Sequence, residues 1–223
     1  MQSHKTPVVL LGFYGIILFM SELVVGGGEA EGLQPYPYYD PRFHTGEVQL
    51  NATTQIALEA VQGLPVVEIG GPTTRGFRML GQKALFRQPP LITNIHGPQA
   101  DAHMNGAALA LPDERIGMCL ASHIGTSDYF RHPDVLQDDI IAGAAAEYEA
   151  FIADPAYKPN YNLRLKILSE MHRVIVPGGL AVMEAIGVED VAAMHSLGWR
   201  ELQIQTVRRP TASLVDGVFI KPL

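Results

Sequence analysis

Apolar residues from about position 48 onward form short continuous runs, and between these runs they recur at helical spacing. Short apolar runs rich in β-branched residues are typical of buried strands. Such runs lie at 66–69, 90–95, 115–124 and 180–186. Helical spacing predicts helices at 51–62, after Arg75, at 133–153 and at 163–174. The pattern therefore predicts strands that alternate with helices.

The alternation of strands and helices indicates the fold class. Strand–helix–strand units connect by right-handed crossovers and form a mostly parallel sheet. Two further strands are predicted near 200–207 and 214–220, and they could pair as an antiparallel hairpin at one edge of the sheet. We therefore expect an α/β fold.

The first 31 residues have a different pattern. After Lys5, residues 7–20 carry no charge, and serine, glycine and other small residues follow them. A basic start, a short apolar region and a small-residue tail resemble a secretory signal peptide. The apolar segment also approaches the length of about 20 residues that spans a membrane, and a helix packed on the domain is the third interpretation. We expect a membrane-associated or secretory-pathway protein, with a cytoplasmic location as the alternative.

The length of 223 residues suits one α/β domain with an appendage. Residues 33–47 hold three prolines among tyrosines, so they predict an extended linker rather than a helix or a central strand. The expected organisation is a hydrophobic segment (1–31), a proline- and tyrosine-rich linker (32–47) and one domain (48–223).

Charge and composition narrow the expected partners. The formal net charge is −7 and no run of lysines or arginines occurs, so we expect no nucleic-acid partner. The single cysteine, Cys119, lies in an apolar run and is expected to be buried and unreactive. The eight histidines are scattered without cysteines at zinc-ligand spacing, so we expect no metal site.

The sequence VVEIGGPTT at 66–74 places a glycine pair at the end of a predicted buried strand. Open α/β sheets commonly bind ligands at such strand ends. Burying Glu68 within this strand would be costly without partners, which favours a functional or hydrogen-bonded role for its carboxylate.

Three motifs, taken in order, resemble the class I S-adenosylmethionine-dependent methyltransferases, a family with a seven-stranded Rossmann-like fold. The motifs are VVEIGGPT, NGAALALPDERIGMCLASHIG and LSEMHRVIVPGGLAVMEAI. The resemblance covers residues 48–223 and implies a three-layer sandwich whose mostly parallel seven-stranded sheet ends in an antiparallel C-terminal hairpin. It implies S-adenosylmethionine as cofactor and transfer of a methyl group to a small-molecule or lipid-like acceptor.

The resemblance also implies which residues contact the cofactor. Glu68 would orient the glycine loop or reach the methionine amino group. Asn94 or His96 would face the ribose, and Asn105 would face the adenine amino group. The implied cofactor-binding residues are Glu68, Gly70, Gly71, Pro72, Thr73, Asn94, Asn105, Gly106, Ala107 and Ser122.

The catalytic residue is left open. The sulfonium methyl group is already electrophilic, so the protein chiefly positions the acceptor, and a general base helps only when the acceptor is protonated. His123, at the expected mouth of the site, is a candidate base or substrate contact; a histidine bonded to the backbone is the alternative interpretation.

Several positions depart from the family pattern. Pro72 and Thr74 stand where the family has loop glycines, the second strand lacks an acidic end, and Gly117 stands where the fourth strand commonly begins with an acidic residue. The alternative to an active enzyme is therefore a catalytically inactive methyltransferase-like domain that serves as a binding or scaffolding module.

Overall fold

The computed structural model describes residues 32–40, 42, 48–74, 76–80, 85–95, 98–122, 124, 158–209 and 212–223. Four predictions fall outside these residues: the apolar segment 1–31, the position of His96, the helix at 133–153 and the position of His123.

Seven strands form the central sheet, in the order β5-β4-β2-β6-β7-β9-β8. Their bounds are Val66–Ile69 (β2), Leu91–Asn94 (β4), Ala102–His103 (β5), Ile116–Ser122 (β6), Ile175–Ile186 (β7), Arg200–Arg209 (β8) and Ala212–Ile220 (β9). Neighbouring strands from β5 to β7 are parallel, whereas β9 pairs antiparallel with both β7 and β8. The predicted mostly parallel seven-stranded sheet with an antiparallel C-terminal hairpin is confirmed.

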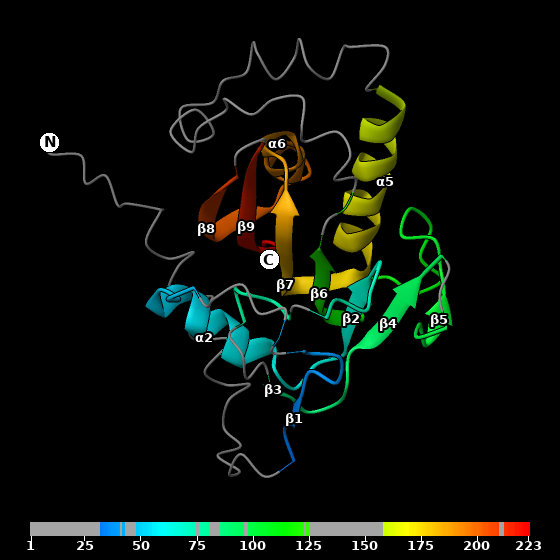
Figure 1. Ribbon diagram of the computed structural model, residues 1–223, viewed down its shortest axis with the longest axis vertical. Helices are drawn as coiled ribbons and strands as arrows, with labels where there is room; N and C mark the ends of the chain where they lie inside the picture. The colour runs from blue at the N-terminus through cyan, green and yellow to red at the C-terminus, as the bar shows by residue number, and fades with distance from the viewer. Residues whose placement is uncertain are drawn as a thin grey trace, which may run out of the picture.

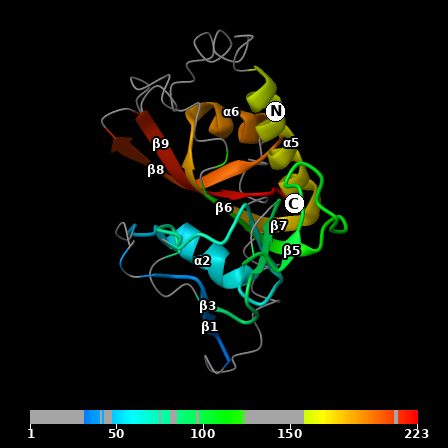
Figure 2. The ribbon, with the colours of Figure 1, turned by 45° about the vertical axis from the view of Figure 1, so that its right-hand side comes forward.

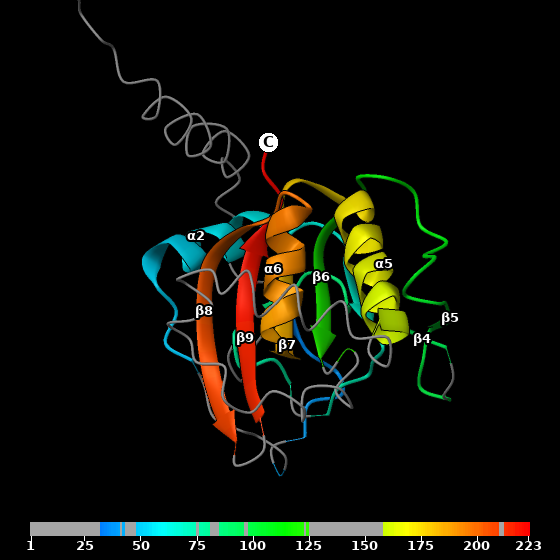
Figure 3. The ribbon, with the colours of Figure 1, turned by 90° about the horizontal axis from the view of Figure 1, so that it is seen from above.

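Helices cover both faces of this sheet (Figures 1 and 2). One face carries α2 (Ala52–Val61) and a two-stranded antiparallel ribbon of β1 (Gln34–Pro35) and β3 (Leu85–Phe86). The other face carries α5 (Lys158–Val174) and α6 (Val188–Ser196), which lie side by side in Figure 3. The expected three-layer arrangement is therefore present.

Each face of the sheet has its own apolar core, because successive side chains of a strand point to opposite faces. Val67 and Cys119 belong to the cluster beneath α5 and α6. Their chain neighbours Val66 and Leu120 belong to the cluster beneath α2. The continuous apolar runs in the sequence thus reflect strands that are buried on both faces.

Most predicted elements are present, with shifted ends. The helix predicted at 51–62 is α2, and the side chain of Asn51 caps it by accepting a hydrogen bond from Thr54 N at 2.8 Å. β7 already begins at Ile175 and passes through the proline–glycine turn that was expected to precede it. The register between β6 and β7 shifts in this region.

The helix predicted after Arg75 is absent from the described residues before β4, namely 76–80 and 85–90, which form turns, bends and β3. Phe77 and Met79 are both buried beneath α2. Residues two apart lie on different sides of a helix, so a helix here could not bury both side chains against one core. The prediction was wrong because it did not include this packing.

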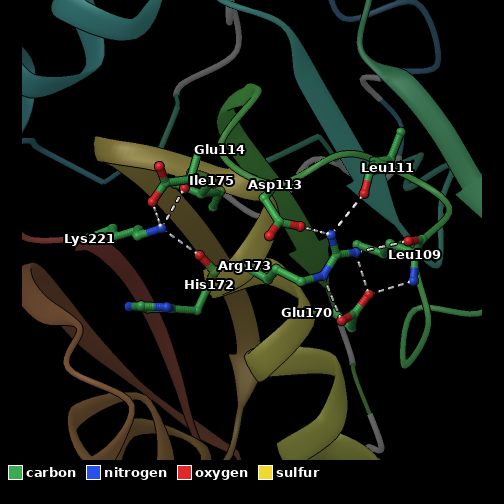
Figure 4. A network of polar contacts seen from close by, with 9 residues as sticks. All are labelled: Leu109, Leu111, Asp113, Glu114, Glu170, His172, Arg173, Ile175 and Lys221. Atoms are coloured by element: carbon green, nitrogen blue, oxygen red, sulfur yellow. Dashed lines mark hydrogen bonds and ion pairs between the residues drawn. The ribbon is translucent and has the colours of Figure 1, made fainter.

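The C-terminal end of α5 is fixed by Lys221, which follows β9 (Figure 4). Its Nζ donates to the backbone oxygens of His172 and Ile175 at 2.9 Å each, and to Glu114 Oε1 at 3.0 Å. A lysine that satisfies the last carbonyl groups of a helix is a favourable cap.

Cys119 lies in the middle of β6 and is fully buried, as predicted. Burial raises the pKa of its thiol well above the usual range. None of the helices in the described ranges is long and apolar enough to cross a membrane.

Candidate functional site

The chain changes the direction in which it adds strands to the sheet between β2 and β6. Strands β4 and β5 lie on the β2 side, whereas β7, β9 and β8 lie on the β6 side. A crevice outside the carboxyl ends of the strands at such a point is the usual ligand site of open α/β sheets. Gly70 follows the end of β2, and Ser122 ends β6. Two of the predicted cofactor-binding residues, Gly70 and Ser122, therefore lie at the switch point.

Glu68 supports the loop that follows β2. Only 1% of the residue is exposed. Its Oε1 accepts a hydrogen bond from Thr73 N at 2.8 Å, and its Oε2 accepts one from the hydroxyl of Tyr36. Burial raises the pKa of Glu68 to about 7, whereas these two hydrogen bonds lower it. Of the two roles predicted for Glu68, the geometry matches orientation of the loop.

Gly70 and Gly71 differ in the room around them. Gly70 has a φ of +78°, and a Cβ added there would meet nothing within 4 Å. A Cβ on Gly71 would lie 2.3 Å from Glu68 Cδ. Gly70 therefore adopts a backbone conformation that favours glycine and leaves the space beside the loop open. Gly71 makes room for the Glu68 carboxylate.

The loop amides are satisfied within the protein. Gly70 N and Gly71 N both donate to Thr93 O, at 2.8 and 3.1 Å. Thr73 N donates to Glu68 and also contacts the Tyr36 hydroxyl at 3.1 Å. Pro72 has no N–H to donate. The loop is consequently held against β4 and Tyr36 by its own hydrogen bonds.

Asn94, at the end of β4, also contacts this loop. Its Nδ2 donates to Gly71 O at 2.7 Å, and its side chain is half-buried. An asparagine side chain carries two N–H groups and an acceptor oxygen. The residue predicted to face the ribose thus lies beside the glycine loop and helps to fix it.

The segment after β5 approaches the same edge. Asn105 Oδ1 accepts from Ala107 N at 2.9 Å, which forms a local turn. Gly106 is buried, and a Cβ there would lie 2.8 Å from Ile69 Cγ2. Gly106 therefore allows this turn to lie directly against the end of β2.

A buried acidic pair that the sequence analysis missed lies beyond Ser122. Ser122 pairs in register with Glu184 of β7. Burial first, and then the neighbouring Asp216 carboxylate, raise the pKa of Glu184 to about 8. Glu184 Oε1 accepts from Met79 N at 3.2 Å, and Asp216 forms an ion pair with Arg78 at 2.9 Å. The pair thus anchors the loop that contains Arg78 and Met79 to β7 and β9.

Tyr36 is the second residue that sequence reasoning missed. It lies in the stretch expected to be a linker, yet only 6% of it is exposed and it packs edge-on against Phe77. The tyrosine-rich composition of this stretch was the available signal, because tyrosine combines a large apolar ring with a polar tip.

The structure brings together the loop at 70–73, Glu68, Asn94, the turn at 105–107 and Ser122, while His123 lies outside the described residues. Among these residues, Gly70 leaves open space at the switch point. The described residues contain no group of three or more histidine, cysteine, aspartate or glutamate side chains suited to a metal.

No protein-family model and no curated protein matches the sequence. Solved structures match at low identity. NodS, an N-methyltransferase from Bradyrhizobium japonicum, is 9% identical with a TM-score of 0.46, over 76% of this chain and 92% of NodS. A SAM-dependent methyltransferase from Methanosarcina mazei is 10% identical with a TM-score of 0.41, over 79% of this chain and 100% of that protein.

Other matches are partial. TTHA0409 from Thermus thermophilus, described as a candidate DNA modification methylase, is 12% identical with a TM-score of 0.33 over 51% of this chain. The chain spans about half the length of TTHA0409 (48%) and of PH0851 (47%). The order of the seven strands and the antiparallel β9 define the architecture of this chain as a Rossmann-like α/β fold with an antiparallel C-terminal hairpin.

Proposed function

We propose that the protein is an S-adenosylmethionine-dependent methyltransferase that acts on a small-molecule or lipid-like acceptor. The observation that carries this proposal is the glycine loop at the switch point of a methyltransferase-like sheet, with open space at Gly70 and the buried Glu68 beneath it.

In this proposal the chain binds and orients, and the bound cofactor supplies an electrophilic methyl group. The loop at 70–73 holds the amino-acid end, and Asn94 lies beside the ribose. The turn at 105–107 borders the adenine, and Ser122 lies near the transferred methyl group. Positioning alone supplies a large part of the acceleration of such a reaction.

The acceptor class is supported by charge. The net charge of −7 opposes the binding of a polyanion such as DNA or RNA. Methyl transfer from labelled S-adenosylmethionine into three pools, namely small metabolites, lipid extract and total RNA, tests this. Label in the RNA pool alone contradicts the proposed acceptor class.

A second candidate function is supported by the hydrogen bonds of the loop. The N–H groups of Gly70, Gly71 and Thr73 already donate to acceptors within the protein. Pro72 has no backbone N–H group. An inactive methyltransferase-like domain that serves as a binding or scaffolding module would keep this arrangement.

Titration calorimetry with S-adenosylmethionine and S-adenosylhomocysteine separates the two functions. We expect micromolar binding that Gly70→Arg abolishes. Gly198→Arg is the matched control, because Gly198 also has a positive φ (+93°) and open space, but lies between α6 and β8. Absence of binding by the folded wild-type protein would favour the scaffold, and equal binding by both variants would rule out the loop as the cofactor site.

We also propose that residues 1–31 target the protein to a membrane or to the secretory pathway, because of their basic start and uncharged apolar run. S-adenosylmethionine is made in the cytosol, so the side on which the domain lies bears on its activity. Protease treatment of sealed microsomes tests the proposal. Full recovery of the protein in the soluble fraction, with its first residues intact, would contradict it.

A further inference from the structure

The irregular segment between β5 and β6 is held by one face of α5 (Figure 4). This segment begins with the turn at 105–107 and continues through Leu109, Leu111 and Asp113 to β6. A segment without regular structure must find partners for its backbone polar groups elsewhere. Here the partners come from Glu170 and Arg173.

Arg173 uses its whole guanidinium group on this task. Its NH1 donates to Leu111 O at 2.9 Å and to Asp113 Oδ1 at 2.5 Å. Its NH2 donates to Leu109 O at 2.9 Å and to Glu170 Oε2 at 2.8 Å, and its Nε donates to Glu170 Oε1 at 2.9 Å. A guanidinium group has five N–H donors in a rigid fork. Three of these five hydrogen bonds, those to Leu109, Leu111 and Asp113, fix the segment relative to α5, and the two to Glu170 orient the guanidinium group.

Glu170 completes the attachment. Its Oε2 also accepts from Leu109 N at 2.8 Å, so both backbone polar groups of Leu109 are bonded to the Glu170–Arg173 pair. The hydrogen bonds from Arg173 hold the pKa of Glu170 below its usual range. Leu109 is itself buried, with 5% of the residue exposed.

The same face of α5 reaches the turn at 105–107 one helical turn earlier. A Cβ on Gly106 would lie 2.8 Å from Ile69 and 3.5 Å from Ile167. Ile167 and Glu170 are three residues apart, so they lie on one face of the helix. The turn is thus confined between the end of β2 and α5, and Leu109 is anchored close behind it.

We propose that Glu170 and Arg173 are positioning residues for the adenosyl end of the cofactor, acting through the segment from Asn105 to Asp113. This inference rests on the proposed function. In this proposal neither side chain touches the cofactor. Together they hold the turn at 105–107, which borders the adenine, against the end of β2 and beside the glycine loop.

The test compares two ligands that share the adenosyl group. S-adenosylhomocysteine has the amino-acid end, and 5′-methylthioadenosine lacks it. Arg173→Lys retains the positive charge but loses the forked arrangement of N–H donors. We expect it to weaken the binding of both ligands by the same factor, about tenfold, in calorimetry. Glu170→Gln should weaken both in the same way, and Tyr36→Phe, at the other end of the site, should weaken S-adenosylhomocysteine alone.

Arg115→Met is the matched control, because Arg115 is an exposed arginine that follows this segment by two residues, directly before β6. It should bind both ligands like the wild type. Thermal unfolding of each variant, measured in parallel, shows that the ligands meet folded protein.

Folded Arg173→Lys and Glu170→Gln variants that bind both ligands as the wild type does would overturn the inference. So would a loss confined to S-adenosylhomocysteine. A folded wild type that binds neither ligand would overturn the proposed function itself, which is a different result.

Discussion

Of the two glycines in the loop, Gly71 has the less room for a side chain. Its missing side chain leaves space for a carboxylate that is buried and held by two hydrogen bonds. Glu68 therefore cannot move away from an added methyl group without breaking those bonds. The identity of this glycine is determined by what lies behind the loop rather than by a ligand in front of it.

We expect Gly71→Ala to lower the free energy of unfolding by about 1–3 kcal/mol, because the added Cβ overlaps Glu68 Cδ. It should also weaken S-adenosylhomocysteine binding, because the loop must shift. Gly63→Ala is the control, since its Cβ would lie 3.8 Å from the nearest atom, in Arg87. Urea unfolding of both variants measures the difference, and equal stabilities would contradict the clash.

Tyr36→Phe tests the second support of the loop. The change removes the hydroxyl that donates to Glu68 and contacts Thr73 N, and leaves a buried carboxylate oxygen without that partner. We expect a loss of about 1–3 kcal/mol in the free energy of unfolding. Tyr38→Phe is the control, because the Tyr38 hydroxyl makes one long contact, at 3.4 Å, with Gln99 O. Equal losses in the two variants would argue against a specific role for Tyr36.

At the level of residues, the sequence predicted the glycine loop but not its support. An apolar run that ends in Gly70 and Gly71 is a local pattern. The contact between Tyr36 and Glu68 joins positions 32 residues apart, and no local spacing encodes it. The role of Asn94 was likewise assigned from its place at a strand end, whereas its bond to Gly71 O depends on how the loop folds back.

At the level of elements, the alternation of buried strands and helices was readable because each element is long or strongly apolar. β5 was not predicted because it has only two residues, Ala102 and His103. α6 was also missed, although Val191 and Met194 are spaced as on one buried helix face and Gly198 follows the helix. That signal was present in the sequence and was not used.

The junction of α5 with β7 gives a prediction at this level. Lys221→Met removes an ammonium group that donates to two backbone carbonyls and to Glu114. We expect the free energy of unfolding to fall by about 1–3 kcal/mol. Lys166 is an exposed lysine on α5. Lys166→Met should change the free energy of unfolding by less than about 0.5 kcal/mol. Urea unfolding compares the two, and a silent Lys221→Met would show that the cap contributes nothing measurable.

For the molecule as a whole, two buried carboxyl groups determine part of the pH dependence of stability. Burial raises the pKa of Glu68 to about 7 and that of Glu184 to about 8. The folded protein therefore holds these protons more tightly than the unfolded chain, in which the pKa of a glutamate is about 4.3. Their contribution to stability is complete below that value and is lost as the pH rises through 7 to 8.

We accordingly expect the free energy of unfolding to decrease between about pH 5 and about pH 8.5. The decrease should be smaller in the double variant Glu68→Gln/Glu184→Gln. Glu59→Gln, at an exposed position on α2, should retain the wild-type slope. Urea unfolding across this range measures all three proteins, and a double variant with the wild-type slope would refute the assignment to these groups.

The burial of Cys119 has a practical consequence for measuring binding. No other thiol is present in the chain, and this one lies in the central strand β6 with no exposed surface. A thiol reagent therefore reacts with the native protein only when the strands around Cys119 separate, so the rate of modification reports how often they do. A ligand that binds only the closed fold slows that reaction in step with the fraction of protein it occupies. The chain thus contains its own built-in reporter, which can rank candidate cofactors and acceptors before any methyl transfer is observed.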